Sequence, residues 1–378
     1  MYSFKNTSVY VDGKGIVKTD LSFNDKIVST DSAIGTVIDL PKNAIVLPGF
    51  IDRHIHGAYG VDAMDASVDA IKTMSYELVK EGTTSFLPTT MTCDAQDIKS
   101  ALKSIREYKE MDEFLGAEVI GVHLEGPFIN EKYKGAQKSD FILKPSVQLF
   151  DEFNKESGNL IKIVTVAPEA DGMQDFISKV SKKGVCVSVG HSSAKFSDVL
   201  DATVNGLSST THTFNAQSPL HHRDVGVVGA TLLLDVYAEL IADTIHVSIP
   251  AMRLLVNSKP NNKIILVTDA MRAKGLADGE SELGGQKVFV KNGEARLVDG
   301  TLAGSVLKMN DAIKNVVQYL AVSLEDAVDM ATKNPAKSLS IFDKKGSIKE
   351  GKDADFAVID EDFNVLMTIR GGKIVYKA

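Results

Sequence analysis

The sequence has little of several features that would place a protein in a specific class. Cys93 and Cys186 are the only cysteines among 378 residues, which disfavours both a disulfide framework and a cysteine-based zinc site. No apolar run approaches the roughly 20 residues that a membrane-spanning helix needs. The N-terminus also lacks the charged-then-apolar layout of a signal peptide. We therefore expect a soluble protein of the cytoplasm.

The chain also lacks an excess of positive charge. Its 42 lysines and arginines are outnumbered by 50 aspartates and glutamates, which gives a net charge of −8. This balance disfavours general binding to nucleic acids or to membrane surfaces. Apolar residues at 44% and charged residues at 24% are typical of globular proteins, so a largely disordered chain is also disfavoured. The length of 378 residues predicts one large domain or two domains.

Both ends of the chain have the pattern of short β-strands. Near the N-terminus, Asp12-Gly13 separates two β-rich runs, which is a hairpin signal. Residues 353–378 again read as short strands, interrupted at Gly371-Gly372. Because chain ends often lie close together, we predict one small β-sandwich domain built from residues 1–47 and 346–378.

Between these ends, short apolar runs alternate with amphipathic stretches rich in lysine and glutamate. Such alternation over about 300 residues predicts an α/β fold with a parallel sheet. Eight units predict a closed (β/α)8 barrel of the TIM type over residues 48–345. No G-x-G-x-x-G motif follows the first run, which disfavours a dinucleotide-binding sheet. The eight runs are AIVLPGFID, TSFLPTT, AEVIGVHLE, KIVTVAP, VCVSVGH, LSSTTHT, AELIADTIH and KIILVTDA.

Metal-competent side chains gather at the carboxyl ends of these runs. Histidines follow the first, fifth, sixth and seventh runs, and an acid ends the third and the eighth. In a (β/α)8 barrel this end carries the active site, so we expect the side chains to converge there. The spacing of two residues also lets His54 and His56 reach one ion. The residues are His54, His56, Glu125, His191, His212, His246 and Asp269.

Each of these residues also has a plain structural interpretation. A lone H-x-H occurs often by chance, and His191 could cap the helical region that follows it. Glu125 and Asp269 are stronger candidates, because a carboxylate that ends an apolar run is costly to bury without a partner. Taken together, the set favours a site for a divalent ion such as Zn²⁺, Fe²⁺, Mn²⁺ or Co²⁺, with Asp269 as general base and acid. We interpret His123 as structural or as a support for the ligands.

A second polar cluster, NAQSPLHHR, contains Asn215, His221, His222 and Arg223. One interpretation is an anion-binding loop near the barrel mouth, in which Arg223 binds phosphate or carboxylate with two hydrogen bonds. The other is an ordinary surface turn, punctuated by Pro219. Composition alone favours neither.

Several motifs together resemble a known family. The chain contains PGFIDRHIHG, HLEGPFIN, GHSSA, THTFNA with SPLHHR, LVTDAM, TLAGS and NPAKSL. They occur in the order found in N-acetylglucosamine-6-phosphate deacetylases of the amidohydrolase superfamily, and the similarity spans nearly the whole chain. It implies a (β/α)8 barrel with a small β-sandwich domain from both termini. It also implies a metal-dependent hydrolase that converts N-acetyl-D-glucosamine 6-phosphate to D-glucosamine 6-phosphate and acetate, in amino-sugar catabolism or cell-wall sugar recycling.

The resemblance further implies roles for individual residues. Asp269 matches the family's catalytic acid and base. Residues that match metal ligands are Glu125, His191 and His212 for the main ion, and His54 and His56 for a second ion, so that one or two ions bind per subunit. Residues that match sugar-phosphate contacts are Ala136, Gln137, Asn215, Ala216, Arg223, His246, Leu302, Ala303 and Gly304. Members of the family are commonly homodimers, in which the partner subunit helps to form the phosphate site.

The sequence departs from the family pattern at positions near the expected pocket. Gln217 stands where methionine is usual, Thr244 replaces a glycine, and Asp224-Val225 replaces Glu-Pro. None of these changes removes a metal ligand or Asp269. They leave two other interpretations open: a deacetylase of N-acetylgalactosamine 6-phosphate or another acetamido sugar phosphate, and a metal-binding homologue without turnover.

Overall fold

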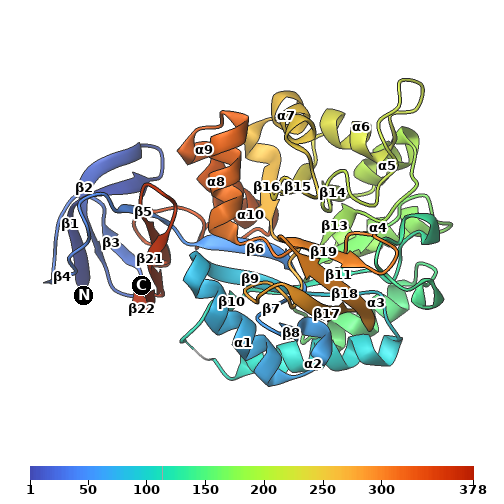
Figure 1. Cartoon of the computed structure of the whole chain (residues 1–378), viewed down its shortest axis with the longest axis horizontal. Helices are drawn as coiled ribbons and strands as arrows, with labels where there is room; N and C mark the ends of the chain where they lie inside the picture. Colours follow the sequence, from blue (N-terminus) through green and yellow to red (C-terminus); the bar gives the residue numbers. More distant parts are fainter. Residues whose placement is uncertain (113) are drawn as a thin grey trace.

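The two ends of the chain form one eight-stranded sheet in the computed structural model, which describes residues 1–112 and 114–378 (Figure 1). Its order is β22-β21-β20-β5-β1-β2-β3, with β4 beside β1. The N-terminal strands are β1 (Tyr2–Val11), β2 (Gly15–Phe23), β3 (Ile27–Ser29), β4 (Thr36–Val37) and β5 (Ile45–Pro48). The C-terminal strands are β20 (Phe356–Ile359), β21 (Val365–Arg370) and β22 (Lys373–Lys377).

Aromatic packing holds the two ends of the chain together in this sheet. The ring of Phe23 lies 5.3 Å from that of Phe4 and 5.1 Å from that of Phe356, between ring centroids. All three side chains are fully buried. The expected hairpin is β1–β2, and its turn has Gly13 at φ 76°, where a left-handed backbone favours glycine. The prediction of a sheet built from both termini is therefore confirmed.

The middle of the chain forms the predicted (β/α)8 barrel of eight parallel strands (Figure 1). Each of the eight apolar runs supplies one barrel strand. The first run, however, divides at Gly49: β5 pairs in the terminal sheet, and β6 pairs with β9 in the barrel. The barrel strands are β6 (Phe50–Ile55), β9 (Thr83–Thr90), β11 (Val122–Glu125), β12 (Ile161–Val166), β13 (Cys186–Val189), β14 (Leu207–Thr210), β15 (Tyr237–Ile241) and β16 (Ile264–Val267), and β10 (Glu118–Val119) precedes β11 beside β9.

The barrel closes between its first and last strands just beyond the end of β16. The backbone N–H of Asp269 donates to the carbonyl of His54 at 2.8 Å, and that of His56 donates to Ala270 at 2.9 Å. Both bonds lie at the carboxyl ends of the strands, where the acids and histidines gather. The seam of the barrel and the candidate site therefore coincide.

Helices follow the barrel strands on the outside, as the amphipathic stretches predict. In α2, Asp94 caps the N-terminus by accepting from the N–H of Gln96, and Ile98, Leu102 and Ile105 are buried at helical spacing. Among the described residues, no helix has both the length and the apolar character to cross a membrane. The α-helices are α1 (Val68–Leu78), α2 (Ala95–Glu110), α3 (Val147–Glu156), α4 (Met173–Ser181), α5 (Phe196–Val204), α6 (Gly226–Leu233), α7 (Ile249–Ser258), α8 (Met309–Leu320), α9 (Leu324–Ala331) and α10 (Lys333–Ser338). Short 3₁₀ turns are η1 (Ala63–Asp65), η2 (Val79–Glu81), η3 (Glu131–Tyr133), η4 (Ser139–Phe141) and η5 (Asn261–Lys263).

An antiparallel sheet of three strands interrupts the alternation after β16. It consists of β17 (Gly279–Leu283), β18 (Gln286–Lys291) and β19 (Glu294–Leu297), and our sequence analysis did not predict it. Leu283, Val288 and Ala295 of this sheet pack with Met91 and Met271 from the barrel end in one apolar cluster. A hairpin, β7 (Gly57–Ala58) with β8 (Val61–Asp62), follows β6.

Partly buried ion pairs link the barrel to the C-terminal segment. The Lys345 ammonium lies 3.0 Å from a carboxylate oxygen of Glu118 on β10 and 2.6 Å from one of Asp355. Lys109 approaches the other oxygen of Glu118 at 2.7 Å. Burial alone would raise the pKa of Glu118, but Lys345 and Lys109 outweigh it and lower the pKa from 4.5 to about 2.

We predict that Glu118→Gln destabilises the protein at neutral pH by about 1–3 kcal/mol and much less in acid. Because the folded-state pKa of Glu118 is the lower one, its contribution is complete above about 4.5 and disappears as the pH falls toward 2. Urea unfolding at pH 7 and at about pH 2 measures the difference in unfolding free energy between variant and wild type. Glu152→Gln removes an exposed partner of Lys99 and serves as the control. An equal gap at both pH values would contradict the prediction.

Candidate metal centre

The predicted acids and histidines converge at the carboxyl end of the barrel. Glu125 is the last residue of β11, His54 lies within β6, and His56, His191, His212 and Asp269 stand one or two residues beyond their strands. These six are buried, with His54 fully so, whereas His246 lies further beyond β15 and is half-buried. Three groups of side chains in the described chain are close enough to share an ion: Glu125, His191 and His212; His54, His56 and Asp269; and His54, His123 and Glu239.

The first group is centred on one oxygen of Glu125. Its Oε1 lies 3.2 Å from Nε2 of His191 and 3.0 Å from Nε2 of His212. The two Nε2 atoms are themselves 3.1 Å apart. Three ligand atoms from three different strands thus surround one small volume.

The second group faces the same glutamate from the other side. Oδ1 of Asp269 lies 3.4 Å from Nε2 of His54 and 3.2 Å from Nε2 of His56. Oε2 of Glu125 lies 3.2 Å from Nε2 of His56, and Oε1 lies 3.5 Å from that of His54. Glu125 therefore stands between the two groups and can serve both.

The tautomers of the histidines fit a bound cation. Nδ1 of His191 donates to the carbonyl of Tyr133 at 2.9 Å, and Nδ1 of His56 donates to that of Thr89 at 3.2 Å. Each neutral ring then presents a bare lone pair on Nε2 to the carboxylate oxygens of Glu125. Such lone pairs and oxygens repel one another unless a cation lies between them. Nitrogen and carboxylate donors of this kind suit Zn²⁺, Fe²⁺, Mn²⁺ and Co²⁺.

The neighbouring charges keep the carboxylates of the site ionised. Burial raises the pKa of Glu125, but the charge of His54 and the hydrogen bonds of the other histidines hold it well below its usual range. Burial also raises the pKa of Asp269, but the charge of His54 outweighs burial and the pKa falls to about 2. Burial lowers the pKa of His56, but its contacts with Asp269 and Glu125 raise it well above its usual range, so without a bound cation this ring holds a proton beside the carboxylates. The ionised carboxylates of Glu125 and Asp269 attract positive charge, which a divalent cation supplies in place of that proton.

Three site residues have a strained backbone. His191, His212 and Asp269 have φ angles of 48°, 32° and 47°, in the left-handed region that residues other than glycine rarely adopt. Such conformations persist only where surrounding bonds enforce them. The carbonyl of His191 accepts from the N–H of Asn130 at 2.9 Å, and that of Asp269 accepts from Ser305 at 2.8 Å.

A cavity of about 340 Å³ opens over these side chains, which is the size of a site for a small molecule. It is bordered on one side by Leu283 of β17 and by residues 301–304. Its lining residues are His56, Met91, Glu125, Lys132, Tyr133, Gly135, Ala136, Gln137, His191, His212, Asn215, Ala216, His246, Asp269, Leu283, Thr301, Leu302 and Gly304.

Most of the predicted sugar-phosphate contacts line this cavity. They are Ala136, Gln137, Asn215, Ala216, His246, Leu302 and Gly304. Ala303 is fully buried beside them and is not among the lining residues. Arg223 also lies outside the cavity wall of the described chain: it is exposed, and its Nη1 atom lies 2.7 Å from Nε2 of His222.

His246 has a fixed orientation at the cavity wall. Its Nδ1 donates to Oδ2 of Asp243 at 2.6 Å, and its backbone N–H donates to Oδ1 of the same residue at 2.8 Å. Nδ1 therefore carries the proton, and the other ring nitrogen is free to accept a hydrogen bond. Thr244, which replaces the glycine of the family motif, lies between the two residues with a φ of 66°.

Sequence reasoning missed several residues of the site. Lys132 and Tyr133 of η3 and Thr301 in a loop lie at the cavity wall, and no pattern in the sequence places them there. Glu239 lies beneath the site, fully buried within β15. The signal for it was available, because an acid inside the apolar run AELIAD is as costly to bury alone as Glu125.

Comparison with known proteins agrees with this geometry. The sequence profile of the amidohydrolase family matches residues 45–375. An N-acetylglucosamine-6-phosphate deacetylase of Bacillus subtilis is 43% identical over 98% of this chain and 96% of its own length. An N-acetylgalactosamine-6-phosphate deacetylase of Escherichia coli O157:H7 is 33% identical over 91% of each chain.

Solved structures give the same result. The crystal structure of N-acetylglucosamine-6-phosphate deacetylase from Pasteurella multocida superposes with a TM-score of 0.93 and 33% identity, over the full length of both chains. That of the enzyme of the same name from Thermotoga maritima gives a TM-score of 0.91 and 34% identity, again over both full chains.

We predict that removing divalent ions with a chelator lowers the midpoint of thermal unfolding by several degrees. An ion at 100 times its dissociation constant adds about 2.7 kcal/mol to the folded state. Restoring Zn²⁺, Mn²⁺, Co²⁺ or Fe²⁺ returns the midpoint in the wild type but not in Glu125→Gln, which loses the charge shared by both groups. Scanning calorimetry with metal analysis of the same samples measures this, with Glu152→Gln as the control. Equal midpoints with and without ions would argue against the site.

Proposed function

The chain belongs to the amidohydrolase family, and we propose that it hydrolyses the acetamide group of N-acetyl-D-glucosamine 6-phosphate to give D-glucosamine 6-phosphate and acetate. The observation that carries the proposal is the position of Asp269. Its carboxylate lies within 3.4 Å of two imidazoles of the candidate metal centre and also lines the cavity. Two N-acetylglucosamine-6-phosphate deacetylases that are 43% and 33% identical to this chain support the same reaction.

Two sets of side chains would hold divalent ions in this reaction. A bound ion supplies Lewis-acid character and lowers the pKa of water beside it. The main set is Glu125, His191 and His212. The second set is His54, His56 and Asp269. The second set includes Asp269, so the proton-transfer group lies next to any ion held there.

Asp269 performs the proton transfers. In the ionised state it accepts a proton from the attacking water, whose oxygen bonds to the acetyl carbon and forms a tetrahedral intermediate. The carbon–nitrogen bond then breaks, and Asp269 returns the proton to the departing amine. The low pKa of Asp269, about 2, keeps its carboxylate ionised at neutral pH.

His246 orients the substrate. Because Asp243 holds the proton on Nδ1, the other ring nitrogen presents a lone pair, which can accept a hydrogen bond from a sugar hydroxyl. Gln137 also lines the cavity, with its amide nitrogen 3.2 Å from Nε2 of His191. These two side chains can therefore fix the sugar over Asp269.

The substrate's phosphate has few cationic partners within a single chain. The cavity wall offers Lys132, whereas Arg223 is exposed outside it. We propose a homodimer in the cytoplasm, in which the loop of Arg223 lies near the subunit boundary and completes the phosphate site. The carboxylate-rich metal centre and a cationic phosphate site at its rim would orient the substrate by charge.

We predict that the purified protein releases acetate from N-acetylglucosamine 6-phosphate, that a chelator abolishes this release, and that a divalent ion restores it. Acetate assay and metal analysis on one sample measure both. N-acetylgalactosamine 6-phosphate is the comparison substrate, because a relative at 33% identity is named N-acetylgalactosamine-6-phosphate deacetylase. A higher kcat/KM for this epimer would assign the second substrate instead. No release of acetate from either sugar by fully metallated protein would contradict a deacetylase.

We predict that Asp269→Asn lowers kcat by about 10²–10⁴-fold with little change in substrate binding. The amide keeps the size and hydrogen bonds of the side chain but cannot carry the proton. Steady-state kinetics and substrate titration by calorimetry separate the two effects. A kcat within tenfold of the wild type would remove Asp269 from this role.

A further inference from the structure

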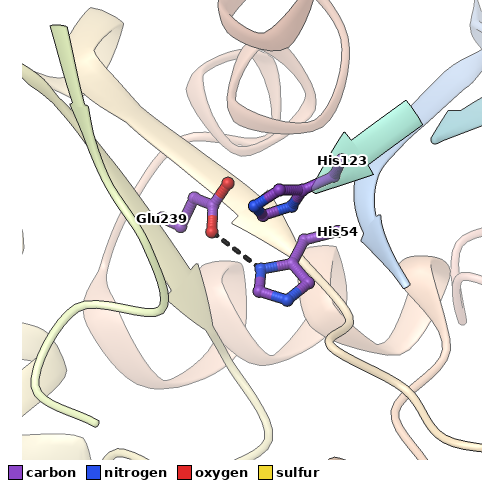
Figure 2. Close-up of side chains that lie close together, drawn as sticks. All are labelled: His54, His123 and Glu239. Carbon is purple, nitrogen blue, oxygen red and sulfur yellow. Dashed lines mark hydrogen bonds and ion pairs between the residues drawn. The ribbon is translucent and has the colours of Figure 1, made fainter. Parts of the chain in front are cut away.

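The buried carboxylate of Glu239 contacts one residue from each half of the metal centre. Its Oε2 atom accepts from Nδ1 of His54 at 3.0 Å and from the backbone N–H of His212 at 3.1 Å (Figure 2 shows the first contact). Its Oε1 atom lies 2.9 Å from Nη2 of Arg53. Glu239, His54 and Arg53 are all fully buried, so these contacts are not exchanged for water.

An irregularity in β6 makes this arrangement possible. Between Asp52 and Ile55 the register of β6 against β9 shifts, because Asp52 pairs with Phe86 and Ile55 with Pro88. One residue of β6 is therefore extra. In a regular strand, consecutive side chains point to opposite faces. Here the consecutive residues Arg53 and His54 both reach Glu239.

The cluster of His54, His123 and Glu239 is a poor site for an ion of its own. The guanidinium of Arg53 already neutralises Glu239 at 2.9 Å and would repel a cation. Nε2 of His123 is bonded to Oγ1 of Thr165 at 2.7 Å, and the His123 ring packs edge-on against that of His54, with centroids 4.5 Å apart (Figure 2). The contact of 3.0 Å between His54 and Glu239 is a hydrogen bond.

We propose that Glu239 is the positioning residue that couples the two halves of the metal centre. By accepting from Nδ1 it fixes the proton of His54 there and turns Nε2 toward Glu125 and Asp269. By accepting from the N–H of His212 it holds the backbone of that residue at its φ of 32°. The proposal concerns how tightly the ions bind. It depends on the proposed function only for the statement that the bound ions are used in catalysis.

A glutamine at position 239 cannot replace the carboxylate while Arg53 is present. The three donors around Glu239, on Arg53, His54 and His212, need both carboxylate oxygens as acceptors, but an amide has one oxygen and one NH₂ group. Either Arg53 or the pair of His54 and His212 then faces a donor. When Arg53 is replaced as well, the single amide oxygen can accept from both His54 and His212.

The test is titration of chelator-treated protein with Co²⁺, followed by calorimetry and by visible absorption. Glu239→Gln is expected to bind Co²⁺ about 10–100-fold more weakly than the wild type. The matched control is Glu81→Gln, whose carboxylate also pairs with a buried cation, Lys274, and accepts from a backbone N–H, that of Met309, away from the ligands. It is expected to lower the unfolding midpoint of the ion-free protein and to leave Co²⁺ affinity and spectrum unchanged.

A second pair of variants decides the matter even if Glu239→Gln does not fold. Arg53→Met/Glu239→Gln and Arg53→Met/Glu239→Leu both lack the buried charges, and they differ in whether residue 239 can accept a hydrogen bond. The glutamine variant is expected to bind Co²⁺ at least tenfold more tightly than the leucine variant. It should also retain the absorption of the wild-type complex.

Several outcomes would overturn the proposal. Wild-type Co²⁺ affinity in Glu239→Gln, or equal affinities in the two double variants, would leave Glu239 with a structural role alone. Three ions per chain in the wild type and two in Glu239→Gln would make Glu239 a ligand of its own ion. Failure of the wild-type protein to release acetate, together with the expected differences in Co²⁺ affinity among the variants, would instead count against the proposed reaction and leave the role of Glu239 in metal binding in place.

Discussion

The structure depends on the cost of burying the charge of Glu125. A carboxylate that is 3% exposed at the end of an apolar strand must have its charge compensated. Four imidazoles from β6, β13, β14 and the residues just beyond them surround it and can hold the cation or proton that does so. The histidines can meet it only if the strands have the tilt and stagger of a closed barrel. The requirement for charge compensation at one point therefore constrains the whole barrel.

Support for these partners extends into the barrel beneath them. Nε2 of His123 contacts Thr165, whose Oγ1 lies 2.8 Å from that of Thr211, and Thr211 in turn lies 2.6 Å from Oγ of Ser188. A polar layer thus replaces the usual apolar filling below the ligands. Such a layer is stable only when its members are paired, and it fixes the positions of the side chains above it.

Much of the fold and many of the site residues could be predicted from the sequence because their signals are local. Each barrel strand is a short apolar run, and an acid or histidine at its end is visible without knowledge of its neighbours. The role of Arg53 and Glu239 was not visible, because it requires a shift of register that brings consecutive residues to the same carboxylate. The division at Gly49 was missed for a similar reason, since one apolar run serves two sheets. The exposure of Arg223 depends on how its loop packs, which the motif SPLHHR does not encode.

The seam between the first and last barrel strands has a consequence for how the protein is made. Glu125, His191 and His212 are synthesised in succession, but the position of Asp269 depends on a bond from its own N–H to His54, more than half of the chain earlier. The second half of the centre therefore cannot exist on a ribosome-bound chain until residue 270 has emerged, and the terminal sheet waits longer still, for β20 to β22. An ion held by His54, His56 and Asp269 therefore arrives at an assembled barrel and cannot nucleate it. Loading of this second set follows synthesis of the barrel.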